Sequence, residues 1–229
     1  MGFKEEIAKH ARDTFATQWT VTDGRKVPTA DSTIGLGNQA SKIDAVVFYA
    51  DLADSTALVR DKKKAFAAEV YKTFVYAAAK SVRHEGGTVT AYDGDRVMGV
   101  FMGDGKENAA VRAAYWLKGA VNDVLMPEMD KHWKAGYKIK HKVGIDACEL
   151  WVANTGIRGN TDYVWVGNAA NNAAKMSALD TTYSTYVTSA VLNQLTDANR
   201  KSNGIDFFHK LEYTSLGYVV YGTNAKITL

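Results

Sequence analysis

The first twenty residues carry apolar side chains at helical spacing. Residues four positions apart lie on one side of an α-helix, so this spacing predicts an amphipathic helix with one apolar stripe. The stripe consists of Phe3, Ile7, Ala11, Phe15 and Trp19. From residue 20 to 41 the pattern gives way to glycine, proline and polar residues, which are typical of an irregular, partly extended connector. We therefore expect an N-terminal helix and connector over residues 1–42 and a main domain over residues 43–229.

The main domain opens with a run of residues, 43–50, that would be apolar on both faces of a strand. Such a run is typical of a strand in the interior of a sheet. The other expected elements are helices at about 60–83, 106–126 and 167–179 and strands at about 88–92, 96–101, 139–147 and 150–153. The order β-α-β-β-α-β is that of a ferredoxin-like core. The sequence therefore predicts an α+β fold with a mixed or antiparallel sheet and flanking helices.

Composition and charge narrow the class of protein. The 229 residues are 46% hydrophobic, which allows a sizeable core, and the net charge of +3 is mild. No apolar run approaches the roughly 18 residues that cross a bilayer, and the charged start of the chain has no apolar signal core. Basic clusters at 62–64 and 138–142 are typical of solvated surface and lack interleaved aromatic residues. With one cysteine, Cys148, we expect a cytoplasmic protein that binds neither membranes nor nucleic acid.

Two aspartates stand beside predicted strands. Asp51 closes the central strand, at the edge where α/β folds commonly bind ligands. It could instead cap the following helix, but residues 54–56 are better placed for a cap. Asp95 follows the hairpin turn at residues 93–94 and would begin the next strand, where an acid is unfavourable without a function. If the hairpin pairs beside the central strand, the two carboxylates converge, and Mg²⁺ or Mn²⁺ with phosphate oxygens is the natural choice to lie between them.

A third polar group lies on the helix that is rich in small residues. Asn171 and Lys175 are four positions apart, so they share one face of that helix. The alanines between them would let another surface approach closely. A polar helix face in solvent is the alternative interpretation.

Together these segments resemble the class III nucleotide cyclases, the catalytic domains of adenylate and guanylate cyclases. Residues 48–56, Phe-Tyr-Ala-Asp-Leu-Ala-Asp-Ser-Thr, are similar to the first metal-binding strand and loop of that family. Residues 86–101 are similar to its second metal-binding segment. Residues 142–146 and 163–175 are similar to the segment that carries its transition-state residues. The resemblance covers about residues 43–179 and implies the cyclase version of the α+β fold.

The resemblance also implies a role for each matching residue. Asp51 and Asp95 match the two metal-binding aspartates, and Leu52 matches the residue whose backbone carbonyl completes one metal shell. Asn171 matches the asparagine that orients the ribose. Lys175 stands where the family usually has arginine, so the charge is kept and the planar fork is lost. The family supplies these last two residues from the partner subunit, which implies a homodimer with two shared sites and two Mg²⁺ or Mn²⁺ ions per site.

Other residues are candidates for contacts with the substrate. Backbone N–H groups around Ala53, Ser55 and Thr56 are expected to cradle the phosphates. The family's triphosphate-binding lysine has no identified counterpart, and Lys210 is the nearest candidate. Arg96 is a candidate for the border of the base, although as the neighbour of Asp95 on a strand it should face the other way.

The positions that read the base depart from the purine cyclases. Ala91 and Val164 stand where those enzymes carry side chains that hydrogen-bond to the purine edge. Tyr49 lies two residues before Asp51, so both side chains point to one face of the strand and Tyr49 narrows the site. A smaller base, a pyrimidine, follows as a hypothesis. The connector segments 24–28 and 36–38, together with residues 48–56 and 93–96, are similar to the pyrimidine cyclases of bacterial Pycsar antiphage systems, and this resemblance extends over the whole chain. That family makes cyclic UMP or cyclic CMP after phage infection, and the product activates a separate effector.

The expected reaction is the conversion of UTP to 3′,5′-cyclic UMP and pyrophosphate. CTP stays open as the substrate, because these residues do not decide between uracil and cytosine. A purine cyclase homologue and a non-catalytic nucleotide-binding regulator, the latter suggested by Lys175, are further alternatives. A diguanylate cyclase or polymerase-palm relative ranks lower, because the chain lacks a Gly-Gly-acid-acid-Phe turn.

Overall fold

The computed structural model describes residues 2–29, 32, 34–134, 136–180, 182–213 and 216–229, and the chain forms two compact units. The first unit comprises residues 1–44 and 149–167, and the second comprises residues 45–148 and 168–229. Strands β2 (Gln39–Leu52) and β5 (His141–Ile157) each contribute residues to both units. The domain boundary between residues 42 and 43 stays a prediction, and the structure adds that residues 149–167 group with the N-terminal part.

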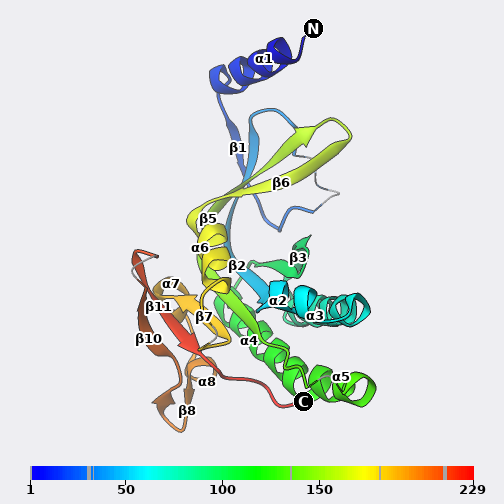
Figure 1. Cartoon of the computed structure of the whole chain (residues 1–229). Helices are drawn as coiled ribbons and strands as arrows, with labels where there is room; N and C mark the ends of the chain where they lie inside the picture. Colours follow the sequence, from blue (N-terminus) through cyan, green and yellow to red (C-terminus); the bar gives the residue numbers. More distant parts are fainter. Residues whose placement is uncertain (1, 30–31, 33, 135, 181, 214–215) are drawn as a thin grey trace. The chain divides into compact units, whose positions relative to one another are not determined.

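A mixed sheet forms the centre of the second unit (Figure 1). Besides β2 and β5, its strands are β3 (Thr88–Asp93), β4 (Arg96–Phe101), β7 (Thr185–Thr188), β10 (His209–Tyr213) and β11 (Tyr218–Thr223). The strand order is β10-β11-β7-β5-β2-β4-β3, with β5 and β7 parallel. β2 thus has a neighbour on each side, which confirms the central position that its apolar run predicts. A separate ribbon pairs β8 (Lys201–Ser202) with β9 (Ile205–Asp206).

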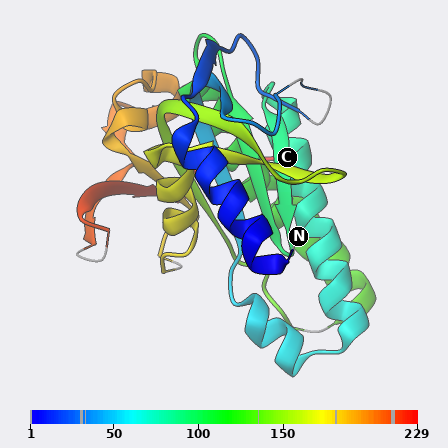
Figure 2. The same cartoon turned by 90° about the horizontal axis from the view of Figure 1, so that it is seen from above.

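Two long helical segments cover one face of this sheet. The first is α3 (Lys64–His84), and the second runs from α4 (Lys106–Gly119) through a π-helix, η1 (Ala120–Leu125), into α5 (Met126–Trp133). In Figure 2, α3 lies at the end of the sheet formed by β3 and β4, and β10 and β11 lie at the opposite end. Within the described part of the second unit, the other helices are α2 (Ser55–Asp61), α6 (Asn168–Ser177), α7 (Ser189–Leu192) and α8 (Asp197–Arg200).

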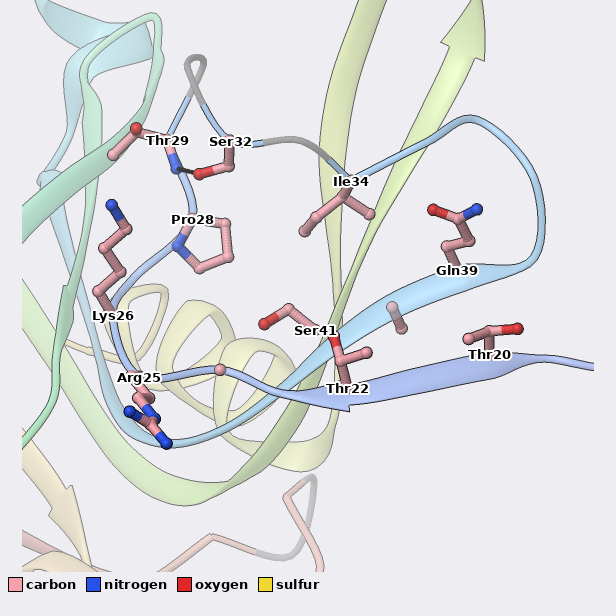
Figure 3. A pocket seen from close by; sticks show the side chains of 12 residues that line it. Thr20, Thr22, Arg25, Lys26, Pro28, Thr29, Ser32, Ile34, Gln39 and Ser41 are labelled. Atoms are coloured by element: carbon pink, nitrogen blue, oxygen red, sulfur yellow. Dashed lines mark hydrogen bonds between the residues drawn. The ribbon is translucent and has the colours of Figure 1, made fainter.

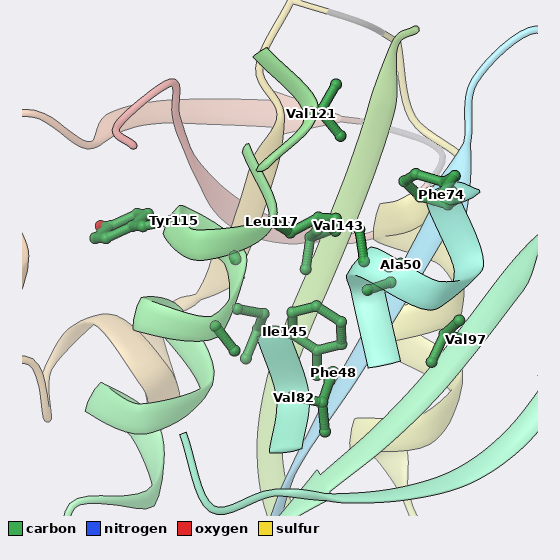
Figure 4. Packing of buried hydrophobic residues seen from close by; sticks show 14 of the residues in the cluster. Phe48, Ala50, Phe74, Val82, Val97, Tyr115, Leu117, Val121, Val143 and Ile145 are labelled. Carbon is green, nitrogen blue, oxygen red and sulfur yellow. The ribbon is translucent and has the colours of Figure 1, made fainter. Parts of the chain in front are cut away.

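The larger hydrophobic core lies between these helices and the sheet (Figure 4). Phe48 of β2 is fully buried there together with Phe74 of α3 and Leu117 of α4. Full burial of one such side chain contributes about 1.5–3 kcal/mol. Gly99 of β4 allows α3 to approach closely, because a Cβ atom at this position would lie 2.8 Å from Cγ1 of Val82. A smaller core cluster on the other face of the sheet contains Met176, Tyr186 and Val220.

The first unit contains α1, β1, β6 and the outer parts of β2 and β5. β1 (Thr20–Asp23) pairs in parallel with the start of β2, and β6 (Asn160–Val166) pairs in antiparallel fashion with the end of β5. The side-chain amide of Asn38 donates to the carbonyls of Thr14 and Thr17, both at 2.7 Å, and so ties the end of α1 (Phe3–Ala16) to the connector. The apolar stripe predicted for α1 is largely solvent-exposed, with Phe3 82% and Phe15 89% exposed.

The predicted helices are found with two corrections. The helix expected over about 60–83 is interrupted, because Lys62 adopts an extended backbone with φ −121° and ψ 163° between α2 and α3. The helix expected to end near Met126 continues through η1 to Trp133. Among the described residues, no helix combines the length and the apolar character needed to span a bilayer.

The strands also differ in part from expectation. The two strands expected at 139–147 and 150–153 form one strand, β5, because the residues between them, Cys148 and Glu149, continue the extended backbone. The connector expected to be irregular contains β1 and the first residues of β2. Residues 30–31 and 33 of that connector lie outside the described residues.

Candidate nucleotide-cyclase site

The alternation of side chains along β2 determines which residues can reach a ligand. Phe48 and Ala50 face the larger core cluster. Successive side chains of a strand point to opposite faces, so Tyr49 and Asp51 share the other face. Both are half-buried. The strand therefore places a phenol and a carboxylate side by side at its C-terminal end.

The β3–β4 hairpin brings a second aspartate to this end of β2. Asp51 pairs with Arg96 in the β2–β4 ladder, and Arg96 pairs with Asp93 in the β3–β4 ladder. The turn consists of Gly94, with φ +61°, and Asp95. Asp95 thus lies in the turn and Arg96 begins β4, which corrects the prediction that Asp95 begins the strand. A positive φ at the first turn position explains the glycine.

Arg96 lies on the same face of the sheet as Asp51. Directly paired residues of neighbouring strands point to the same side, so the expectation that Arg96 faces away is wrong. Its guanidinium forms an ion pair with Asp93. Burial raises the pKa of both Tyr49 and Asp51, and the charge of Arg96 opposes part of that rise.

The carboxylates of Asp51 and Asp95 repel each other. Burial, together with the charge of Asp95, raises the pKa of Asp51 to about 6. The Oδ2 atom of Asp95 is buried and has no hydrogen-bond partner among the described residues. An unpartnered buried oxygen costs free energy, so the arrangement fits a hard divalent cation, which prefers carboxylate oxygens. Within the described ranges no three His, Cys, Asp or Glu side chains cluster to hold a metal ion, so an ion here would draw further ligands from backbone or substrate oxygens.

Two of the residues predicted to read the base, Tyr49 and Ala91, lie on the same face of the sheet as Asp51. They belong to the next row of cross-strand paired residues on that face. Tyr49 pairs with Met98 on β4, and Met98 pairs with Ala91 on β3. This row runs parallel to the row that contains Asp51. Burial raises the pKa of Tyr49, so its hydroxyl stays protonated at neutral pH and can both donate and accept a hydrogen bond.

The loop after β2 contains a residue in the left-handed conformation. Asp54, with φ +60° and ψ 25°, occupies the N-cap position of α2, but its side chain makes no capping hydrogen bond. The N–H of Ala53 donates to the carbonyl of Lys140 at 2.9 Å and is therefore not directed toward a ligand. Ser55 and Thr56 form the start of α2, where amides lack partners within the helix. These two residues remain the predicted contacts to phosphate in this loop.

Helix α6 presents the third group of predicted residues. Asn171 and Lys175 lie on its exposed face, as their spacing predicts, whereas Ala173 and Met176 are buried on the opposite face. Met176 belongs to the smaller core cluster. α6 therefore packs on the same side of the sheet to which Asp51 points.

One lysine of the basic cluster 138–142, which was expected to be solvated surface, acts electrostatically on Asp51. Burial and the charge of Asp95 raise the pKa of Asp51, and the charge of Lys142, on β5, opposes part of that rise. Its ammonium group donates to the carbonyl of Leu179 at 2.6 Å. Lys210, the candidate from sequence, forms a 3.1 Å ion pair with Glu212 on β10. Three strands separate β10 from β2, which is about 19 Å at the spacing of a sheet, so Lys210 does not join the acids of its own chain.

The first unit holds one further predicted residue and an open hollow. Val164 lies on β6, is 40% exposed and pairs with Ala153. The hollow, of about 590 Å³, lies between β1, the start of β2 and the connector (Figure 3), and none of the predicted site residues lines it. Several lining residues carry hydroxyl groups, among them Ser41 and Thr22, which face the interior. Arg25 and Lys26 also line it, and the Arg25 side chain is turned away.

Comparisons with known proteins agree with this arrangement. No family model matches the chain. A uridylate cyclase of Xanthomonas perforans is 45% identical over 226 residues, which is 98% of this chain and 97% of the relative. A uridylate cyclase of Burkholderia cepacia is 39% identical over 230 residues, and the match covers 100% of both chains.

Solved structures of lower identity share the fold. A bacterial light-regulated adenylyl cyclase superposes with a TM-score of 0.66 at 20% identity, covering 80% of this chain and 91% of that one. A dimeric guanylyl cyclase domain of the RhoGC fusion protein from the aquatic fungus Blastocladiella emersonii gives a TM-score of 0.61 at 14% identity, covering 82% and 100%. These likenesses confirm the predicted α+β cyclase fold. Together with full-length identity of up to 45%, they show that this chain belongs to the uridylate cyclase family.

Proposed function

We propose that this protein converts UTP to 3′,5′-cyclic UMP and pyrophosphate. One observation carries the proposal: Asp51 and Asp95 meet at the end of β2, and a buried oxygen of Asp95 has no protein partner. The names of full-length relatives support UTP as the substrate. The retained aspartates favour an enzyme over a regulator that only binds nucleotide.

The two acids would hold divalent cations in the working enzyme. Asp51 and Asp95, with the backbone carbonyl of Leu52, are the residues that would bind two Mg²⁺ or Mn²⁺ ions. Such ions supply Lewis acidity, which makes the ribose 3′-hydroxyl easier to deprotonate and offsets the charge of the leaving pyrophosphate. Lys142 is the cationic side chain of β5 that acts on Asp51, and we assign it to the phosphates of the bound nucleotide.

The residues of α6 complete the site across a homodimer. Asn171 and Lys175 are exposed on one helix face, where they can reach a nucleotide bound by the other subunit. Asn171 would orient the ribose, and Lys175 would stabilise charge that develops on the α-phosphate. In a symmetric pair each subunit then contributes to two sites, once with its acids and once with α6.

Selection of the base is assigned to the cross-strand row of Tyr49, Met98 and Ala91, which lies beside the row that contains Asp51. Tyr49 narrows this row and offers a hydroxyl, and Ala91 offers no hydrogen bond to a purine edge. Val164, predicted to lie near the base, is likewise apolar. A small base that is read by one hydroxyl fits these residues better than a purine does.

The biological setting is part of the same proposal. The resemblance to the pyrimidine cyclases of Pycsar systems supports a role in antiphage defence, with the cyclic nucleotide acting on a separate effector protein. A cytoplasmic location is supported by the single cysteine, which suits a reducing compartment.

The test is a comparison of nucleotides and of matched variants. The purified protein with Mn²⁺ is offered UTP, CTP, ATP and GTP, and products are identified by mass spectrometry. We expect cyclic UMP as the main product, and loss of about 100-fold or more in kcat for Asp51→Asn. Asp61→Asn, on the surface of α2 in an ion pair with Arg60, is the matched control and should retain full activity. Faster cyclisation of ATP or GTP than of UTP would refute the assignment of the base.

The second candidate is a cytidylate cyclase. The hydroxyl of Tyr49 can donate to a carbonyl or accept from an amine, and uracil and cytosine differ in that group. The same assay separates the two, because CTP would then give cyclic CMP faster than UTP gives cyclic UMP.

A further inference from the structure

One row of side chains on β5 supports α6 along its length. Alternate residues of a strand point to one face, and on β5 the face opposite the larger core is formed by the even-numbered residues from Lys142 to Cys148. At one end Lys142 donates to the carbonyl of Leu179, just after α6, at 2.6 Å. At the other end the thiol of Cys148 accepts a hydrogen bond from the N–H of Ala169 at 3.3 Å. Both ends of α6 are thus held by the same strand.

The middle of the row sets how closely helix and strand approach. Gly144 is overlaid by α6, because a Cβ atom there would lie only 2.1 Å from the carbonyl oxygen of Ala173. Ala169 and Ala173 are buried residues of α6 with short side chains, and the Cβ atom of Met176 would lie 2.8 Å from a Cβ atom at Gly144, so Met176 also packs here. The contacts of Gly144 with Ala173 and Met176 fix the distance between the two elements, but these contacts contain no side-chain hydrogen bond that would fix the rotation of the helix about its axis.

Asp146 supplies the directional contact that such a surface lacks. Its side chain is only 4% exposed. Oδ2 accepts a hydrogen bond from the side-chain amide of Asn172 on α6 at 2.8 Å. Oδ1 accepts from the N–H of Ala147 at 2.8 Å and from the hydroxyl of Thr188 on β7. The carboxylate thus joins three elements of the fold, and two of them, β5 and β7, are adjacent strands of the sheet.

We propose that Asp146 and Asn172 form a positioning pair that fixes the rotation of α6 and thereby directs Asn171 and Lys175 to the nucleotide. The inference rests on the proposed function, because it assumes that these two side chains contact substrate. Asn172 follows Asn171 directly, so any rotation that breaks the bond to Asp146 also turns Asn171 and Lys175 away.

A role in stability alone does not explain the choice of these residues. Removing a carboxylate from water is costly, and a pair of well-packed apolar side chains would hold the helix to the sheet at least as firmly. What an apolar pair does not provide is direction, because hydrogen bonds weaken steeply away from a straight geometry. The polar pair is therefore suited to fixing an angle.

The decisive variant replaces the hydrogen-bond donor of the pair, the amide of Asn172, with a carboxylate. Asn172→Asp places a second carboxylate against Asp146, so the two groups repel and α6 turns or shifts. A displacement of about 1 Å at a catalytic group lowers rates by about 100-fold, so kcat for UTP should fall by about that factor. The KM for UTP should change by less than about threefold, because most contacts to the substrate remain.

The rescue variant exchanges the two side chains. In Asp146→Asn/Asn172→Asp, the new amide at 146 donates to the new carboxylate at 172, and its oxygen still accepts from Thr188. We expect kcat within about fivefold of the natural protein. Asp146→Asn alone should also remain active, because the amide of Asn172 can turn and accept the hydrogen bond.

A control separates loss of position from loss of stability. Val121→Ala removes two methyl groups from the larger core, away from α6, and should lower the melting temperature while leaving kcat unchanged. If Asn172→Asp does not fold, Asn172→Ala is measured in its place, with a kcat loss of about tenfold expected from the lost bond.

The outcomes distinguish this inference from the proposed function. If the natural protein forms no cyclic UMP from UTP, the proposed function fails. If it forms cyclic UMP and Asn172→Asp keeps its kcat, the positioning role is refuted. If the double variant melts like the natural protein but does not recover kcat, the positioning role is refuted as well.

Discussion

Acid sensitivity of the fold is expected to depend strongly on one histidine. His141, the first residue of β5, is buried and packs against Phe74 at a ring distance of 5.9 Å. Its Nε2 atom has no hydrogen-bond partner among the described residues. Burial, with a smaller effect from the charge of Lys118, lowers the pKa of His141 to about 3. The folded protein therefore keeps this imidazole neutral well below the pH at which an exposed histidine takes up a proton.

The sign and size of the effect follow from this difference in pKa. The unfolded chain protonates His141 near its ordinary pKa of about 6.5, and the folded chain does so only near 3. Between these values the unfolded state binds more protons, so the free energy of unfolding falls as the pH falls. One pKa unit corresponds to about 1.4 kcal/mol, so between pH 6.5 and 4.5 this residue alone should lower stability by about 2–3 kcal/mol.

The assay is denaturant unfolding at several pH values. His141→Phe cannot take up a proton, so its free energy of unfolding should fall less between pH 6.5 and 4.5 than that of the natural protein, by about 2–3 kcal/mol. His10→Gln, at an exposed position of α1, is the control and should keep the natural pH dependence. If the curves of His141→Phe and the natural protein run parallel, the buried neutral imidazole is not the cause and the reasoning is refuted.

Three further predictions concern the site and its support. Gly144→Ala would bring a Cβ atom against the carbonyl of Ala173, so the free energy of unfolding should fall by about 1–3 kcal/mol, which a thermal melt would show. Lys142→Met should lower kcat/KM for UTP by about tenfold or more, whereas Lys138→Met, an exposed lysine of the same basic cluster, should have no effect in the same steady-state assay. Tyr49→Ala should lower the preference for UTP over ATP, measured as the ratio of kcat/KM values, by about tenfold, and an unchanged ratio would remove Tyr49 from base selection.

The parts of the fold with strong local signals could be predicted from the sequence. The apolar run of β2 indicated a central strand, and the Asp-Gly pair indicated the β3–β4 hairpin. The break at Lys62 was not predicted, because it contains no glycine or proline and the helical pattern continues across it. β6 was missed because most of its residues are exposed, and without burial on one face a strand has no alternating pattern.

The site was predicted more accurately in composition than in geometry. Asp51 and Tyr49 share one strand face because strand periodicity is simple, and that inference needed no tertiary information. Arg96 was assigned to the wrong face, because whether Asp95 lies in the turn or in the strand shifts the alternation by one residue. Lys142 stood in a cluster of lysines in the sequence, and the position of β5 beside β2 in the sheet brings its charge near Asp51.

The π-helical segment Ala120–Leu125 is a place where the chain should tolerate the deletion of one residue. Each i→i+5 ring encloses one residue more than the i→i+4 ring of an α-helix, so such a segment accommodates a single extra residue without turning the helix that follows. Beyond this segment, Trp133 of α5 packs against Phe66 of α3 at a ring distance of 5.2 Å. Deletion of one residue here, for example Asn122, should leave an uninterrupted α-helix and a folded protein, whereas the same deletion within α3 would rotate every following side chain out of the core.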